Sequence, residues 1–494
     1  MSTTSSLEVR HNIQIIAIRI RKGLAMKKQM HLWDIIFINV AAIVGLRWLP
    51  IAAGFGAAAI MFWVIGTIIF FIPLGLMSSE LATAWPDEGG LYVWVKTAYG
   101  EKPAFIVSWF YWINGFFYGP SLFTFLAVTA TFVINPSLAQ NKYLICSAVL
   151  VGIWSITLLN LRGLGALKML SKISGLFGII LPGIIIILLG FGSAIFLNKP
   201  IPTSYALPNL IPHLGSIKNI AMLSALMFSM AGIELTPTLA GNTFEPQKTF
   251  PRAILISAVI IVLTYIIGTV AITLIISPDK IGAASGIMDA LDLIAHEIHL
   301  PILVPFMAVM IVLGNLGGAS AWLVAPIKML FESCKGGILP PFLVKLNKHD
   351  MPGNAMLVQT SVVTCIVVFI ALLPSVNVFY ETLLIIAAIT YFIPYIYMFA
   401  SFVKLRRTHA HHPRPYRVPG GMIVAWLCAA LGTLSVLGSM ILAFIMPPAD
   451  ISDPLHILIY HLELAIGVGV FAAIAYWIYW RYERRCRLLK NNEV

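Results

Sequence analysis

Twelve apolar runs, each long enough to cross a lipid bilayer as a helix, constrain the fold of this chain more than any other feature. The hydrocarbon core of a membrane takes about 20 residues of helix. Charged residues make up only 11% of the sequence, against about 25% in soluble proteins. We therefore expect an all-α integral membrane protein with twelve transmembrane helices. They cover residues 31–56, 59–82, 103–134, 143–161, 170–197, 219–243, 252–278, 300–331, 356–374, 379–403, 421–446 and 457–480.

Basic residues are distributed unevenly between the connecting segments. If the N-terminus is cytoplasmic, the inner segments carry 27 Lys and Arg and the outer loops carry 4, with Arg47 as the remaining one of 32. This bias follows the positive-inside rule, and an even number of spans returns both termini to the cytoplasm. We expect a multi-pass protein of the bacterial inner (plasma) membrane. Its net charge of +12 then reflects topology and attraction to anionic lipid, and no nucleic acid is expected as a partner.

The N-terminal segment, residues 1–30, is basic and carries no A-x-A-like cleavage site of a secretory signal. It is either a basic helix lying on the membrane surface or an unstructured tail, with Met26 as an alternative start. The C-terminal tail, residues 481–494, is short and also basic.

The sequence offers no catalytic or metal-binding motif. Five cysteines are scattered without a C-x-x-C pair, which argues against a disulfide framework and a metal site. No P-loop, nucleophile elbow or His-Glu-x-x-His is present, so we expect no enzyme, no cofactor and no metal. Two histidine-rich stretches stay open: HEIH (296–299) is a ligand cluster or part of a solvated loop, and RRTHAHH (406–412) is a pH sensor or a basic loop.

Two spans contain matching interruptions. The first reads NVAAIVGLRWLP and the sixth reads ALMFSMAGIELTP. Both follow the pattern Gly-x-charge-x-x-Pro, with Gly45, Arg47 and Pro50 in one span and Gly232, Glu234 and Pro237 in the other. Glycine frees the backbone angles, and proline removes a hydrogen-bond donor. Because these are the first spans of two successive sets of five, we expect broken helices 1 and 6 in two inverted five-helix repeats.

A helix break within the membrane exposes backbone groups that lipid cannot satisfy. The break must therefore be buried or line a watery cavity. Free N–H groups suit a carboxylate, and free carbonyls suit an ammonium group, so both together suit a zwitterion such as an amino acid. The alternative is that these glycines and prolines only kink the helices, as in many transmembrane segments.

Arg47 and Glu234 are charges within the membrane. An isolated charge at the bilayer centre costs about 2.5–3.5 kcal/mol, so both are expected to face the interior of the bundle. They pair, directly or through the substrate, or Arg47 lies in a solvated vestibule. An arginine that lines the cavity favours a second carboxylate, as in glutamate or aspartate. Neutralisation of Arg47 by Glu234 makes neutral amino acids equally suitable.

Aromatic residues are further candidates for the cavity wall. Tyr118 shares a face of span 3 with Asn114, and Tyr391 shares a face of span 10 with Tyr395. Trp48 either caps the substrate or stacks on a cation. Packing and interfacial anchoring are the alternatives for such residues.

Polar residues in the later spans allow two interpretations. Asn315 and Ser320 in span 8 line the cavity, or they connect helices as small polar residues do. Glu80 and Glu463 lie near the ends of their spans, and we interpret them as interfacial.

Three separated motifs resemble the amino acid–polyamine–organocation superfamily of permeases. They are FSMAGIELTPTLAGNTFEPQKTFPRA (228–253), SELATAWPDEGGLYVWVKTAYG (79–100) and RPYRVPGG (414–421). Within the superfamily, the chain is most similar to the bacterial glutamate:GABA antiporters. That similarity lies in LKMLSKISGLFGIILPGIIIILLG (167–190), GAASGIMDAL (282–291) and LGNLGGASAWLVAPIKMLF (313–331).

The resemblance implies the domain organisation of the chain. It consists of a cytoplasmic basic segment (1–30), a first inverted repeat (31–197), a second inverted repeat (219–403), two extra helices (421–480) and a cytoplasmic tail (481–494). The substrate site then lies between broken spans 1 and 6 and opens by alternating access.

The resemblance also assigns roles to residues at the breaks. Backbone around Val44, Gly45 and Leu46 would hold the substrate carboxylate. Backbone around Ser229, Ala231, Gly232 and Ile233 would take the amino group, and Glu234 would link the site to a gate.

The chain departs from the family pattern at several positions. Arg47 and Trp48 are not part of it, and an acidic residue expected in span 8 is replaced by Gly318. The tail is too short to form the pH-dependent plug of the acid-resistance antiporters. The interior lysine of proton-coupled relatives has no counterpart near 175–178, since Lys168 and Lys172 lie at the start of span 5.

We therefore expect a secondary active amino acid antiporter of the glutamate:GABA type. The alternatives are a proton-coupled amino acid symporter and a non-transporting amino acid sensor. The expected partners are the lipid bilayer and an amino acid, which is glutamate, GABA or a neutral amino acid. The sequence leaves the oligomeric state open.

Overall fold

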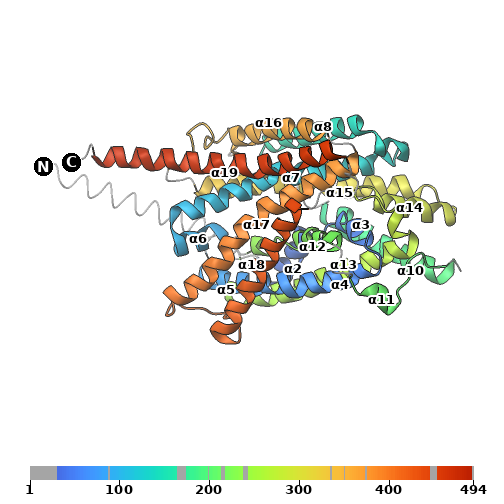
Figure 1. The fold of residues 1–494 in the computed structure, drawn as a ribbon, viewed down its shortest axis with the longest axis horizontal. Coiled ribbons are helices and arrows are strands. Elements are labelled where there is room, and N and C mark those ends of the chain that lie inside the picture. The colour runs from blue at the N-terminus through green and yellow to red at the C-terminus, as the bar shows by residue number, and fades with distance from the viewer. Residues whose placement is uncertain are drawn as a thin grey trace.

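The protein is helical in the computed structural model, and no strand occurs among the residues that the structure describes (Figure 1). These residues are 30–86, 90–163, 174–197, 200–212, 217–236, 243–333, 337–349, 351–372, 375–445 and 453–491. The basic segment predicted at the N-terminus lies outside them except for Met30, as do Lys168, Lys172 and Pro237.

Within this described part of the chain, nine segments are long and apolar enough to cross a membrane, and each falls on a predicted span. They are α4–η1–α5 (Ala58–Ala84), α7 (Glu101–Thr131), α8 (Lys142–Asn160), Phe177–Phe196 in η3 and α10, α13 (Pro246–Ile275), Leu303–Ser320 in α15, α17 (Val376–Thr408), α18 (Gly421–Ile445) and Pro454–Leu488 in α19. Three shorter apolar segments, Leu32–Ile43, Leu223–Thr236 and Gly353–Phe369, fall on the remaining predicted spans 1, 6 and 9. The all-helical membrane fold is confirmed, and the layout as twelve spans in two inverted repeats stays a prediction.

The other elements complete these spans or connect them. They are α2 (Leu32–Ile43), α3 (Trp48–Ala53), α4 (Ala58–Gly66), η1 (Thr67–Phe71), α5 (Ile72–Ala84), α6 (Leu91–Tyr99), η2 (Pro136–Gln140), η3 (Ser174–Ile180), α10 (Leu181–Phe196), α11 (Leu207–Leu210), α12 (Ile217–Ser229), η5 (Pro278–Lys280), α14 (Gly286–Glu297), α15 (Leu303–Ser333), α16 (Gly353–Ile370) and α19 (Pro454–Asn491). In Figure 1, α6 and the C-terminal end of α19 lie at one end of the molecule, and α14 and α11 lie toward the other.

Two helices form the centre of the bundle. In the most apolar stretch of α7, 83% of the residues are buried, and in that of α17, 72% are buried. In the corresponding stretch of α19, only 22% are buried. The two central helices are joined where the side-chain amide of Asn114 donates to the carbonyl oxygen of Ala387 at 2.7 Å. Since α19 has the hydropathy of a span but little buried surface, its exposed face is suited to lipid.

Spans 5 and 8 approach each other backbone to backbone. A Cβ atom added at Gly178 in η3 would overlap with the backbone of Gly314 in α15, and one at Gly314 would overlap with Gly178. Two glycines therefore permit this contact, as small residues commonly do between membrane helices.

Both glutamates interpreted as interfacial are buried, so that interpretation is wrong. The side chain of Glu80 is bound by Arg406 and Arg414, with 2.8 Å from the Arg406 Nε to Oε1, and it accepts the Val418 N–H at 2.8 Å. Glu463 is 3% exposed, and in the described part of the chain neither of its carboxylate oxygens has a hydrogen-bond partner. The position of Glu80 near the end of a span did not reveal that its side chain is buried, because its partners lie more than 300 residues away in the sequence.

The two histidine-rich stretches adopt different structures. His296 belongs to α14 and not to a loop, and its Nε2 lies 3.7 Å from the Asp292 carboxylate. No group of three potential metal ligands occurs there or elsewhere in the described residues. His412 stacks on Trp85, with 4.6 Å between ring centroids, and its Nε2 lies 2.9 Å from the Ala84 carbonyl oxygen. The segment after α17 therefore folds back onto the end of α5.

Candidate substrate-binding site

The first broken helix has the geometry that its sequence predicts. Helix α2 ends at Ile43 and α3 begins at Trp48, so residues 44–47 connect two half-helices within span 1. The Trp48 N–H donates to the Gly45 carbonyl oxygen at 3.1 Å. A Cβ atom at Gly45 would lie 3.0 Å from Cδ1 of Trp48, so a small residue suits this tight turn.

The second break lies in span 6, also at the predicted position. Helix α12 ends at Ser229, and a short 3-10 turn follows from Ile233. Between them Gly232 has a φ of +118°, a conformation that residues with side chains rarely adopt. Both glycines of the repeated pattern thus lie at points where the helix is interrupted.

One side chain from α13 connects the two breaks. The hydroxyl of Tyr265 donates to the Ile43 carbonyl oxygen at 2.6 Å, and the Ser229 carbonyl oxygen lies 3.1 Å from it. The Gly45 N–H also approaches this hydroxyl, at 3.4 Å. Tyr265 is held in place by stacking on Trp63, with 4.5 Å between centroids and an interplanar angle of 6°. Sequence analysis missed Tyr265, and its only signal was the single tyrosine in the middle of span 7.

Glu234 is bound by tyrosine hydroxyls. Tyr391 donates to Oε1 and Tyr395 donates to Oε2, each at 2.7 Å. Tyr111 lies 3.3 Å from Oε1 and 2.7 Å from the Tyr391 hydroxyl, and the Gly232 N–H reaches Oε2 at 3.2 Å. This carboxylate therefore ties the break of span 6 to α7 and α17 by charge-assisted hydrogen bonds.

Arg47 is bound by aromatic rings and not by a carboxylate. Its Cζ lies 4.3 Å from the centroid of the Tyr118 ring and 4.7 Å from that of Trp48, and Nη1 donates to Ser121 Oγ at 3.2 Å. Nη2 is buried and has no hydrogen-bond partner among the described residues. The structure contains no Arg47–Glu234 ion pair, so the hypothesis of direct pairing is wrong for this conformation. Because Arg47 is only 3% exposed, a solvated vestibule does not describe its surroundings either.

A cavity of about 400 Å³ lies beside the break of span 1. Seven of the thirteen predicted site residues line it: Val44, Gly45, Leu46, Arg47, Trp48, Tyr118 and Asn315. The other six, Ser229, Ala231, Gly232, Ile233, Glu234 and Tyr391, are not among its lining residues, and Leu235 is the lining residue from that part of span 6. Arg47 is the charged residue of the described lining, so the cavity has a positive character.

Both interpretations of Asn315 are compatible with its position. It lines the cavity, and its side-chain amide donates to the carbonyl oxygens of Ile311 at 2.7 Å and Gly178 at 3.2 Å. Ser320, in contrast, donates to Asn160 at 2.7 Å and connects helices. Trp322 also lines the cavity, with its ring centroid 4.7 Å from that of Tyr118. We had not singled it out, although it follows a glycine-rich run in the sequence.

Comparison with known proteins places this geometry in a family. The amino acid permease family model matches residues 30–471. An uncharacterised transporter of Legionella pneumophila is 34% identical, over 92% of this chain and 97% of its own length. A glutamate/gamma-aminobutyrate antiporter of Lactococcus lactis is 23% identical over 93% and 92%, and a probable agmatine/putrescine antiporter of the same species is 26% identical over 86% and 89%.

These matches span the broken helices and the cavity alike, and they confirm the resemblance stated on the sequence motifs. They also indicate a transporter and not an enzyme. The chain belongs to the amino acid permease family and, with it, to the amino acid–polyamine–organocation superfamily.

Proposed function

We propose that this protein is an amino acid antiporter of the glutamate:GABA type, working by alternating access in the bacterial inner membrane with both termini in the cytoplasm. The observation that carries the proposal is the cavity of about 400 Å³ at the broken first span. Pockets of roughly 300–1,000 Å³ commonly bind small molecules. The relatives named as antiporters support exchange as the mode of transport, and the relatives named above give a non-transporting sensor no support.

The substrate's α-carboxylate would bind to backbone N–H groups around Val44–Leu46, which line the cavity beside the break. The ammonium group would bind to carbonyl groups around Ser229–Ile233. Because the Ser229 carbonyl now faces the Tyr265 hydroxyl at 3.1 Å, binding there would compete with that contact. Substrate binding at the break of span 6 would then change the hydrogen bonding of Tyr265 at the break of span 1.

Arg47 would select the substrate's side chain. A carboxylate that reached Nη2 would accept a charge-assisted hydrogen bond there and would supply a counter-charge for the buried guanidinium. In the same cavity, Arg47 would repel a dication such as a diamine. The lining therefore favours an amino acid with a second carboxylate over a polyamine.

Glu234 would couple the cavity to the change of access. Its hydrogen bonds join the unwound part of span 6 to Tyr111 in α7 and to two tyrosines in α17. A movement of α12 relative to these central helices would stretch or break those bonds. We propose this cluster as the link from the site to the gate.

Counterflow in proteoliposomes tests the proposal. Vesicles loaded with unlabelled glutamate should take up labelled glutamate or GABA, whereas empty vesicles should not, and an imposed pH gradient should have no effect. Uptake into empty vesicles that collapses with a protonophore would instead establish the symporter. If none of the twenty amino acids, GABA or polyamines were taken up, the transport proposal would be wrong. Vesicles without protein provide the background.

A further inference from the structure

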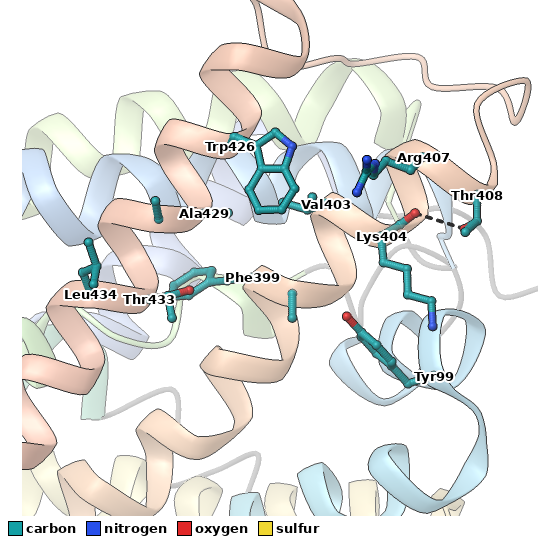
Figure 2. A pocket seen from close by; sticks show the side chains of 12 residues that line it. Tyr99, Phe399, Val403, Lys404, Arg407, Thr408, Trp426, Ala429, Thr433 and Leu434 are labelled. Carbon is teal, nitrogen blue, oxygen red and sulfur yellow. Dashed lines mark hydrogen bonds between the residues drawn. The ribbon is translucent and has the colours of Figure 1, made fainter.

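A second and larger cavity lies away from the substrate site. It measures about 800 Å³ and is formed by the C-terminal end of α17, the N-terminal half of α18 and the end of α6 (Figure 2). Its lining residues are Tyr99, Phe399, Ala400, Val403, Lys404, Arg407, Thr408, Trp426, Ala429, Ala430, Thr433 and Leu434. None of them belongs to the lining of the cavity at the first break.

The lining changes in character from one end to the other. In Figure 2, Lys404, Arg407 and Tyr99 lie at one end, and Leu434 and Thr433 lie at the opposite end. The wall between them is apolar, with Phe399, Val403 and small alanines. The cavity thus offers two cations at one end and an apolar wall leading away from them.

The two cations are not neutralised by acidic side chains. The Lys404 Nζ lies 4.1 Å from the centroid of the Tyr99 ring, and the Arg407 Cζ lies 6.0 Å from that of Trp426. Neither forms an ion pair with a carboxylate in the described part of the chain. The neighbouring Arg406 shows the contrast, because it is buried against Glu80. Lys404 and Arg407 are three residues apart, so they project from one face of α17.

We propose that this cavity binds an anionic glycerophospholipid. Its phosphate would lie between Lys404 and Arg407, and one acyl chain would follow the apolar wall toward Leu434. Charge complementarity and the change from basic to apolar lining match the two parts of such a lipid. Basic pockets between membrane helices bind anionic headgroups in this way, and the positive-inside bias places this end of α17 at the cytoplasmic leaflet. Tyr99 and Trp426 supply the aromatic side chains that favour this interface.

Native mass spectrometry of the full chain, purified and delipidated in a neutral detergent, tests the proposal. Titration with phosphatidylglycerol should show one tightly bound lipid per chain, with phosphatidylcholine of the same acyl chains at least tenfold weaker. The double variant Lys404→Ala/Arg407→Ala should bind phosphatidylglycerol at least tenfold more weakly. Ala430→Trp, which places a large side chain in the apolar part of the cavity and keeps both cations, should also weaken phosphatidylglycerol binding.

The matched control removes two cations that also lie on aromatic rings but are outside the cavity. Arg481 and Arg484 lie on the rings of Trp477 and Trp480 at 4.8 and 5.6 Å but do not line this cavity. Arg481→Ala/Arg484→Ala should therefore bind phosphatidylglycerol like the unmodified protein, and an unchanged melting temperature identifies each variant as folded.

Three outcomes would overturn the proposal. The first is undiminished phosphatidylglycerol binding by the Lys404/Arg407 variant or by Ala430→Trp. The second is displacement of the lipid by glycerol phosphate at equal concentration, which would assign the site to a soluble anion. The third is a dimer that dissociates in the Lys404/Arg407 variant, which would assign the cavity to a second copy of the chain.

Discussion

The hydroxyl of Tyr265 lies 2.6 Å from the carbonyl oxygen of Ile43, where the first half of span 1 ends, and 3.1 Å from that of Ser229, where the first half of span 6 ends. One hydroxyl thus lies within hydrogen-bond distance of backbone carbonyls at both breaks. Lipid could not satisfy these carbonyls, because it offers no hydrogen-bond donor.

Tyr265→Phe should lower transport and stability together. The substitution removes the single hydroxyl hydrogen that two buried carbonyl oxygens share, and an unsatisfied buried carbonyl costs about 1–3 kcal/mol. We expect a lower melting temperature and at least a fivefold slower exchange in the proteoliposome assay. Tyr205→Phe is the matched control, because it also removes a tyrosine hydroxyl, one that contacts Thr273 about two turns along α13 from Tyr265 and has no contact with the backbone at either break. Equal losses of transport in both variants would argue against a special role for Tyr265.

Arg47→Ala should reduce the uptake of acidic substrates more than the uptake of neutral ones. A hydrogen bond between charged groups contributes about 1.5–3 kcal/mol, so glutamate uptake at low concentration should fall about 10- to 100-fold. Competition by neutral amino acids should change little. Ser121→Ala, which removes only the partner of Nη1, should have a small effect. If the variant takes up acidic and neutral substrates with equally reduced rates, Arg47 acts in gating or folding and not in substrate selection.

Glu234→Gln should slow exchange by about tenfold or more, since it replaces charge-assisted hydrogen bonds by weaker neutral ones. Tyr391→Phe and Tyr395→Phe each remove one of the two bonds at 2.7 Å. Each should therefore slow exchange less than Glu234→Gln does. Initial rates of counterflow provide the measurement. A Glu234→Gln variant with the rate of the unmodified protein would remove this cluster from the proposed gate.

Glu80→Gln and Glu463→Gln should have opposite effects on stability. Breaking the buried pair of Glu80 and Arg406 costs about 3–5 kcal/mol, because the arginine is left without its partner. Glu463 has no hydrogen-bond partner to lose among the residues that the structure describes, so glutamine at this position should keep or raise the melting temperature and leave exchange unchanged. Thermal unfolding in detergent compares the two. A loss of exchange in folded Glu463→Gln would assign that carboxyl a part in transport.

Asp289→Asn should stabilise the protein at neutral pH. Burial raises the pKa of the Asp289 carboxyl, although the Ser285 hydroxyl donates to it at 2.6 Å. The folded state therefore binds this proton more tightly than the unfolded state does. Protonation of Asp289 therefore contributes to the stability of the folded state. This contribution is complete below the ordinary pKa of 3.8 and is lost as the pH rises through the raised pKa of the folded state.

The melting temperature of Asp289→Asn should accordingly exceed that of the unmodified protein at pH 7, and the difference should shrink toward pH 4. Asp292→Asn serves as a control on the same helix, because its carboxylate is more exposed and faces His296. It should not be stabilising at pH 7. A destabilised Asp289→Asn variant at pH 7 would show that the Ser285 hydrogen bond outweighs the cost of burial.

The positions of the two breaks were predictable because they depend on local chemistry. Gly45 and Gly232 interrupt their helices for reasons that can be read from neighbouring residues. The partners of the two charges were not predictable, since Arg47 and Ser121 lie 74 residues apart in sequence. Glu234 and Tyr395 are 161 residues apart. Such contacts depend on which helix faces meet, and apolar periodicity does not specify those faces in a chain where nearly every face is apolar.

The contact of Gly178 with Gly314 also restricts how access to the cavity can change. Backbone meets backbone there, so no side chain can adopt another rotamer to absorb a displacement between η3 and α15. We therefore expect these two segments to move together, along with Ile179 and Asn315 of the cavity wall. If access to the cavity changes, we expect the change on the side of the span 1 half-helices, where residues 44–47 interrupt the helix.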